Sequence, residues 1–118
     1  MCIRDSHRVV DLTGKTKLPE LLDILNHAAC VITNDTGPAH LSIALGTPTV
    51  VIVGGGHFGS FVPYPKEVRP PYVRFVFVEM SCYHCFWHCN KRESKQEVFP
   101  CVRDVSVDTV WGLSLIHI

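Results

Sequence analysis

Two short runs of apolar residues constrain this chain more than any other feature. The runs are Cys30–Thr33 and Thr49–Val53, and polar residues do not alternate within them. Strands of this kind are buried on both faces, as happens when helices cover both sides of a parallel sheet. The segment between them predicts a helix that opens at Pro38 and ends at Gly46. We expect its core face to consist of Leu41, Ala44 and Leu45.

The flanking segments continue this alternation of strands and helices. Arg8–Leu12 predicts an earlier buried strand, and Tyr72–Val78 predicts a later one. Apolar residues at spacings of three and four predict a helix after the first strand, with Pro19 in its first turn. Its apolar stripe is Leu18, Leu21, Leu22, Ile24 and Leu25, closed by Ala28 and Ala29. A last short helix is expected at Val105–Trp111. The order indicates an α/β fold with a parallel sheet and right-handed crossovers.

Size and charge narrow the possible functions. A chain of 118 residues is long enough for one domain. Its 11 basic and 11 acidic side chains balance, which disfavours a dedicated nucleic-acid-binding module. The longest nearly apolar run, Thr47–Val53, is far too short to span a bilayer. Four of the six cysteines crowd into Cys82–Cys101, so we expect a reduced, cytoplasmic setting without disulfide staples.

The two ends differ in character from the rest of the chain. Residues 1–6 and 113–118 resemble translated sequencing-adaptor tails, and we exclude both from fold prediction. The alternative is a native strand at each end. On the first interpretation, residues 7–112 are an internal fragment of a longer protein.

The segment Asn34–His40 is the most informative for function, because it joins the end of a predicted strand to the start of a helix. Open parallel sheets bind ligands at such junctions. Exposed N–H groups at residues 36–40 would form a cradle for pyrophosphate, and Gly37 would let the backbone approach it closely. Thr36 and His40 could reach the same anion, and Asp35 could accept a hydrogen bond from a sugar hydroxyl. The segment therefore predicts a site for a diphosphate flanked by a sugar.

Two other interpretations of this segment remain. Asp35 and Thr36 could simply cap the helix, with His40 packed or solvated. A hydrolase triad of Asp35, His40 and Ser42 would need a nucleophile elbow, and the sequence has none.

Three stretches, Asp11–Leu21, Val31–Leu41 and Ala44–Pro48, resemble the signature of glycosyltransferase family 9, which includes ADP-heptose:lipopolysaccharide heptosyltransferases. The resemblance runs from about Val9 to about Trp111. It implies the C-terminal, donor-binding, Rossmann-like half of a two-domain GT-B enzyme. It also implies inverting transfer by direct displacement with no cofactor. The general base would come from the N-terminal domain, so we expect this chain alone to be inactive.

The resemblance also assigns roles to individual residues. Asp35, Thr36, Gly37 and His40 would hold the diphosphate and sugar of the donor, and the loop at Thr16 would contact its base, which is adenine in an ADP-sugar. The acceptor implied is a lipid-linked saccharide of the lipopolysaccharide type. The enzyme would then work in the cytoplasm at the inner face of the bacterial inner membrane, with peripheral membrane association and no transmembrane segment.

The long loop Gly54–Pro71 departs from the family pattern, which often has a Gly-Pro-Thr-like turn here. Gly54–Gly59, with Glu79 beyond it, formally matches a dinucleotide-binding fingerprint. That motif requires a following helix, which the prolines of this loop exclude. These are Pro63, Pro65, Pro70 and Pro71. We expect instead a flexible loop beside the donor cleft, with His57 either solvated or a second polar contact.

The cysteine-rich segment 81–101 has two interpretations. Four thiolates could hold a structural zinc ion, with His84 and His88 as substitutes: Cys82, Cys85, Cys89 and Cys101. Equally, these could be reduced thiols packed with Tyr83, Phe86 and Trp87. The family resemblance implies a structural clip. A zinc-stabilised protein interaction module centred on this segment is the alternative function.

Overall fold

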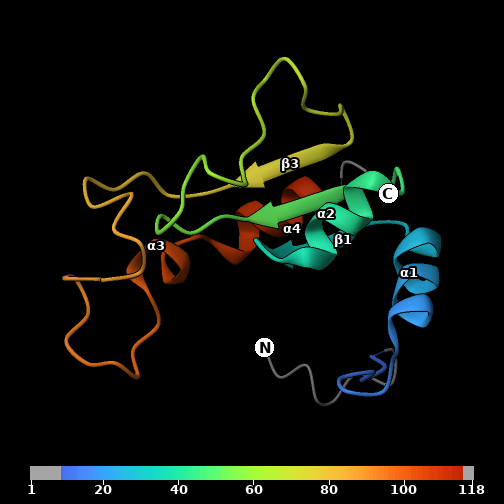
Figure 1. Cartoon of the computed structure of the whole chain (residues 1–118), viewed down its shortest axis with the longest axis horizontal. Coiled ribbons are helices and arrows are strands. Elements are labelled where there is room, and N and C mark those ends of the chain that lie inside the picture. Colours follow the sequence, from blue (N-terminus) through green and yellow to red (C-terminus); the bar gives the residue numbers. More distant parts are fainter. Residues whose placement is uncertain (1–8, 116–118) are drawn as a thin grey trace.

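The computed structural model describes residues 9–115, which form an α/β domain around a parallel sheet (Figure 1). The three strands are β1 (Val31–Asn34), β2 (Thr49–Ile52) and β3 (Val73–Val76), in the order β1-β2-β3. Val31 pairs with Thr49, and Thr49 with Val73. The predicted parallel sheet is therefore confirmed. The tail assigned to residues 1–6, and residues 116–118 of the other tail, lie outside the described residues.

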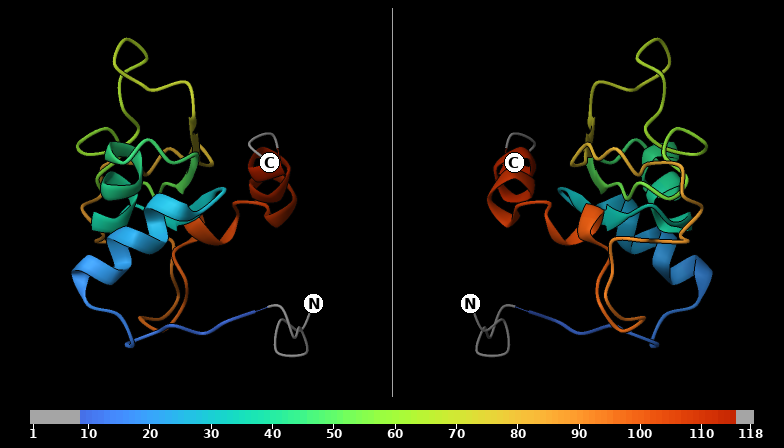
Figure 2. Two further views of the ribbon diagram at one scale, coloured as in Figure 1. Left: turned by 90° about the vertical axis from the view of Figure 1, so that its right-hand side faces the viewer. Right: turned by 90° about the vertical axis from the view of Figure 1, so that its left-hand side faces the viewer.

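The helices lie on both sides of this sheet. They are α1 (Leu18–His27), α2 (Gly37–Ala44), α3 (Pro100–Arg103) and α4 (Val107–Leu115). α2 packs on β1 and β2, and α1 packs against α2. α4 contacts all three strands from the opposite side of the sheet (Figure 2). None of the helices that the structure describes has the length and apolar character needed to cross a membrane.

The central strand β2 is buried from both sides. Val51 packs with Ala39 and Ile43 of α2. Val50 packs with Val110 of α4 on the other face. Coverage by helices on both faces is the reason that this strand lacks polar alternation.

The core face of α2 differs from the prediction. Its buried residues are Ala39, Ser42 and Ile43, whereas Leu41 is half-buried and Ala44 and Leu45 are exposed. The buried Ser42 hydroxyl donates to the Ala39 carbonyl at 2.9 Å and accepts from the Thr49 hydroxyl at 3.0 Å. With these hydrogen bonds made, burying Ser42 carries little penalty. The helix therefore buries the face of Ala39, Ser42 and Ile43 in place of the predicted one.

The strand predicted at Arg8–Leu12 is wrong for residues 9–12, which have no regular structure. Arg8 lies outside the described residues. The Asp11 carboxylate accepts a hydrogen bond from the Thr13 amide at 2.9 Å, and hydrogen bonds from Thr13 lower the pKa of Asp11. This local turn competes with strand formation. Val10 is left 76% exposed.

Two features near the C-terminus were not predicted. The short helix α3 begins at Pro100, and α4 continues past the expected end at Trp111. Leu113 packs against the cluster around Val50, and Ser114 is buried. Residues 113–115, which were assigned to a tail, thus extend the helix that covers one face of the sheet.

Candidate functional site

The connection from β1 to α2 is very short. β1 ends at Asn34 and α2 begins at Gly37, so Asp35 and Thr36 alone link them. The Thr36 side chain makes no capping hydrogen bond to the helix. Its hydroxyl instead donates to the Asn34 carbonyl at 3.4 Å. The interpretation of Thr36 as a simple helix cap is therefore not supported.

The N–H groups at the start of α2 are fewer than the predicted cradle requires. Pro38 has no N–H, and the Ala39 amide donates to the Thr36 carbonyl at 3.1 Å. The Gly37 amide donates to no acceptor within residues 9–115. It lies at the positive end of the helix dipole. Pro38 and Ala39 therefore offer no N–H group to an anion at this helix start, whereas the Gly37 amide does.

Gly37 has no structural need to be glycine. A Cβ atom there would meet nothing within 4 Å, and the residue does not adopt a positive φ. Neither packing nor backbone conformation thus explains the glycine. The helix start is therefore open at the Cβ position of Gly37.

His40 lies between two polar side chains. Its Nδ1 atom is 2.6 Å from the Tyr64 hydroxyl, and its Nε2 atom is 3.9 Å from Asp35 Oδ1. The second distance is too long for a hydrogen bond. The His40 side chain is 39% exposed, so Nε2 is accessible to a ligand.

Tyr64 sets the orientation of His40, and the sequence analysis did not select it. Burial, with a smaller contribution from the negative charge of Asp35, raises the pKa of Tyr64. The phenol therefore keeps its proton at neutral pH and can donate a hydrogen bond to His40 Nδ1. In the neutral tautomer that accepts this hydrogen bond, the imidazole hydrogen lies on Nε2, which can donate to a phosphate or sugar oxygen.

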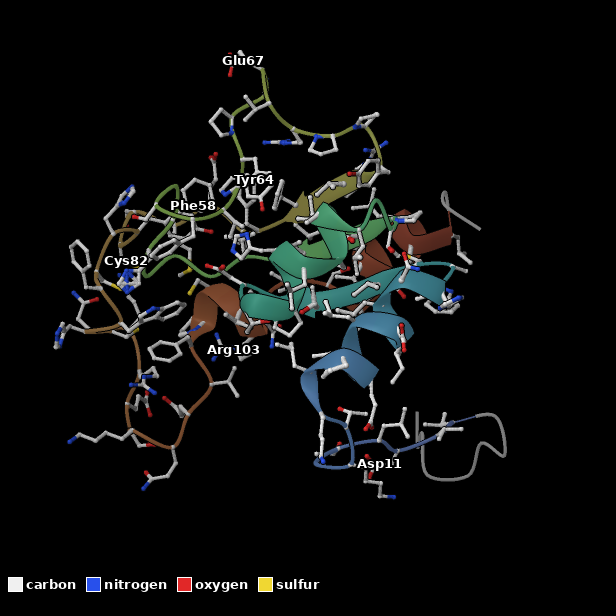
Figure 3. The ribbon with its side chains drawn as sticks, turned by 45° about the vertical axis from the view of Figure 1, so that its right-hand side comes forward. Asp11, Phe58, Tyr64, Glu67, Cys82 and Arg103 are labelled. Atoms are coloured by element: carbon white, nitrogen blue, oxygen red, sulfur yellow. The ribbon has the colours of Figure 1, made fainter. Side chains whose placement is uncertain are left out.

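The loop between β2 and β3 carries Tyr64 to this position. Tyr64 lies near the base of the loop, while Glu67 lies at its outer tip (Figure 3). Arg69 donates two hydrogen bonds to the Tyr64 carbonyl, at 3.2 and 2.8 Å. Its guanidinium also stacks over the Phe75 ring of β3, 5.0 Å from the centroid. These contacts tie the loop to the sheet.

A pocket of about 260 Å³ opens at the carboxyl ends of β1 and β2. It is lined by Asn34, Asp35, Ile52, Gly54, Trp87, Phe99 and Val102. Of the predicted donor-binding residues, Asp35 lines this pocket, whereas Thr36, Gly37 and His40 are not among its lining residues. The rings of Trp87 and Phe99 meet edge to face, with centroids 4.9 Å apart. The pocket therefore combines one carboxylate with an aromatic wall.

Three glycines after β2, Gly54–Gly56, form a contact surface for the cysteine-rich segment, which we call the glycine seat. A Cβ atom on Gly54 or Gly56 would collide with the Trp87 ring, and one on Gly55 would collide with Tyr83. The His84 amide donates to the Gly55 carbonyl at 2.9 Å, and the Phe86 amide donates to the Gly56 carbonyl at 3.0 Å. Close backbone approach thus explains these glycines without a dinucleotide.

No helix follows the glycines between β2 and β3, as the prolines of that loop predicted. His57 is neither fully solvated nor turned toward Asp35. Its ring packs edge-on against Phe86 and Trp87, with centroids 5.3 and 6.2 Å away. The cysteine-rich segment therefore packs into the domain and helps form its cleft.

The remaining predicted residues are not among those that line this pocket. Thr16 is half-buried in the segment before α1, and α1 begins at its end farthest from β1 (Figure 1). Its contact with a nucleotide base stays a prediction. The described cysteines are free thiols: Cys30, Cys82, Cys85, Cys89 and Cys101. In residues 9–115 no three histidine, cysteine or acidic side chains are already arranged to hold a metal ion.

The parallel sheet, the helices on both faces and the pocket at the strand ends define a Rossmann-like α/β domain. The sequence model of glycosyltransferase family 9 (heptosyltransferase) matches residues 2–95, and the chain belongs to this family.

Three curated relatives are heptosyltransferases. The chain is 30% identical over 60 residues to lipopolysaccharide heptosyltransferase 3 of Escherichia coli K12, covering 51% of this chain and 17% of that protein. It is 38% identical over 62 residues to lipooligosaccharide heptosyltransferase 2 of Haemophilus influenzae, covering 52% and 16%. It is 28% identical over 104 residues to lipooligosaccharide heptosyltransferase 2 of Campylobacter jejuni, covering 87% and 30%. The chain thus spans less than a third of each relative. No solved structure matches it.

The glycine seat can be tested by adding a single methyl group. Gly56→Ala places a Cβ atom against the middle of the Trp87 indole, which has to move. We expect urea denaturation to show a loss of about 1 to 3 kcal/mol, together with a change in tryptophan fluorescence. Gly112→Ala in α4 is the control, because its Cβ atom meets nothing within 4 Å. Equal stability of the two variants would contradict this account of the glycines.

Proposed function

We propose that this domain binds the ADP-sugar donor of a glycosyltransferase that transfers heptose or a related sugar to a lipopolysaccharide-type acceptor. The observation that carries the proposal is the Gly37 amide at the start of α2, which donates to no acceptor within residues 9–115. Membership of family 9 and the names of the three relatives support the reaction class.

The diphosphate of the donor would bind at the start of α2. Its oxygens would accept hydrogen bonds from the Gly37 amide, the Thr36 hydroxyl and His40 Nε2. Negative charge builds on the diphosphate as the bond to the sugar breaks. A fixed helix dipole and fixed donors stabilise that charge more in the transition state than in the ground state, so they accelerate transfer.

The rest of the donor would occupy the adjoining pocket. The Asp35 carboxylate is an acceptor for a sugar hydroxyl, and Asp35 lines the pocket two residues before Gly37 in the sequence. The aromatic wall of Trp87 and Phe99 offers an apolar surface to the face of a sugar ring or a base. Thr16 remains the proposed contact for adenine, through the backbone of its loop.

Inverting displacement also needs a general base for the acceptor hydroxyl. We assign that base to a part of the enzyme outside this chain, which spans 16–30% of its relatives. The whole enzyme would work in the cytoplasm, at the inner face of the bacterial inner membrane where the lipid-linked acceptor is presented.

The proposal predicts that the purified 118-residue chain binds donor without transferring it. We expect no glycosylated acceptor when the chain is incubated with ADP-heptose and lipopolysaccharide core and the products are analysed by mass spectrometry. A heptosyltransferase of full length is the positive control. Product formation by the chain alone would refute the assignment of the general base.

The binding site itself can be tested with Gly37→Ala. The methyl group fits without a clash in the free protein, so the melting temperature should stay unchanged or rise slightly. In the complex, however, the methyl group would crowd an anion held by the amide, and a hydrogen bond to a charged group contributes about 1.5 to 3 kcal/mol. We therefore expect the Kd for ADP to rise by about tenfold, measured by isothermal titration calorimetry.

Gly112→Ala is the matched control for this measurement and should bind ADP like the unmodified chain. Gly37→Ala with unchanged affinity, or an unmodified chain that does not bind ADP, would contradict the proposed site.

A further inference from the structure

Four cysteines that are distant in sequence line one small cavity. Cys82, Cys85 and Cys89 belong to the segment after β3, whereas Cys101 is the second residue of α3. The cavity they share has a volume of about 10 Å³. This is close to the volume of a single water-sized sphere. The fold has therefore placed four cysteine residues in the wall of one small cavity.

Two polar groups lie in the wall of this cavity beside the cysteines. The Gly55 amide donates a hydrogen bond to the Cys101 sulfur at 3.3 Å. Such N–H···S bonds stabilise the negative charge of a sulfur ligand. The Lys91 side chain also belongs to the lining and contributes a positive charge. Tyr83 and Phe99 close the cavity with apolar surface.

The backbone between these cysteines bends sharply. His84, Phe86 and Trp87 have φ angles of 70°, 51° and 66°, which residues other than glycine rarely adopt. Such conformations persist when surrounding contacts impose them. The amides of His84 and Phe86 anchor these bends by hydrogen bonds to Gly55 and Gly56. Bonds from a metal ion to the neighbouring cysteines would restrain the same backbone further.

The thiols do not yet have the geometry of a metal centre, since no three ligand side chains in the described part of the chain are arranged around one point. A cysteine sulfur is positioned by a single side-chain torsion, so rotation about χ1 moves it without moving the backbone. All four of these cysteines are free thiols, so no disulfide opposes that rotation.

We propose that Cys82, Cys85, Cys89 and Cys101 together bind one structural zinc ion. Four thiolates form a closed tetrahedral site that leaves no position for a substrate. Each thiol that becomes a ligand releases its proton to solvent, and the zinc ion keeps its oxidation state. The ion would join the loop that carries Trp87 to the helix that follows Phe99, and so would fix the aromatic wall of the cleft. This proposal does not depend on what the cleft binds.

The test is the zinc content of the purified chain, expressed with zinc in the medium and measured by plasma mass spectrometry. We expect one zinc ion per chain, falling roughly tenfold in Cys82→Ser and in Cys101→Ser. The control is Cys30→Ser, which removes a thiol outside the cavity and should keep the metal. A chelator should lower the melting temperature of the unmodified chain by about 5 °C or more.

A second measurement covers the case in which the serine variants fail to fold. Cobalt added to the metal-free, unmodified chain should give the intense visible and charge-transfer absorption of tetrahedral thiolate coordination, with one ion bound per chain. Three results would overturn the proposal. They are an unmodified chain that binds neither zinc nor cobalt, zinc that is retained in both serine variants, and a mass that shows disulfides among the four cysteines in freshly purified protein.

Discussion

The burial of β2 between two helices is the constraint on which the rest of the structure depends. Its residues pack against α2 on one face and α4 on the other. The position of β2 also determines where Gly54–Gly56, just after its end, are placed. The cysteine-rich segment packs on these glycines. Because β1 runs parallel to β2, the start of α2 lies at the same edge of the sheet. The helix start and the aromatic wall of the pocket therefore lie side by side.

The candidate site is built from backbone groups at the start of α2 and from side chains that distant segments contribute. Backbone features supply the anion-binding part, since the Gly37 amide and the helix dipole need no side chain. Contacts between distant segments supply the rest. Tyr64 arrives from the loop between β2 and β3 and orients His40. Trp87 arrives from the cysteine-rich segment and rests on glycines. A strained or displaced loop would thus alter the pocket while leaving the helix start intact.

The sequence predicted those parts of the fold that local patterns encode. Spacing of apolar residues and the positions of Pro38 and Gly46 located α2 to within about two residues. The buried face of the same helix was missed, because the hydrogen bond between Ser42 and Thr49 forms only in the tertiary structure. The strand expected before α1 was missed because the turn at Asp11 prevails there.

The candidate site likewise has residues that local sequence could predict and residues that only the tertiary structure brings in. Asp35, Gly37 and His40 are neighbours in sequence, so their location at the end of a strand followed from the order of elements alone. Tyr64 and Phe99 could not be found this way, because irregular chain paths bring them to the site. The role of Gly54–Gly56 was also hidden, since it depends on aromatic side chains that lie about 30 residues later in the sequence.

The central claim is that an anion binds at the start of α2, and the most direct measurement follows the backbone amides by ¹⁵N-resolved NMR during titration with ADP. The account predicts that the Gly37 cross-peak shifts more than that of any other glycine, with a saturation curve shared by Thr36 and His40. A Gly37 cross-peak that stays fixed while residues elsewhere respond to ADP would contradict it.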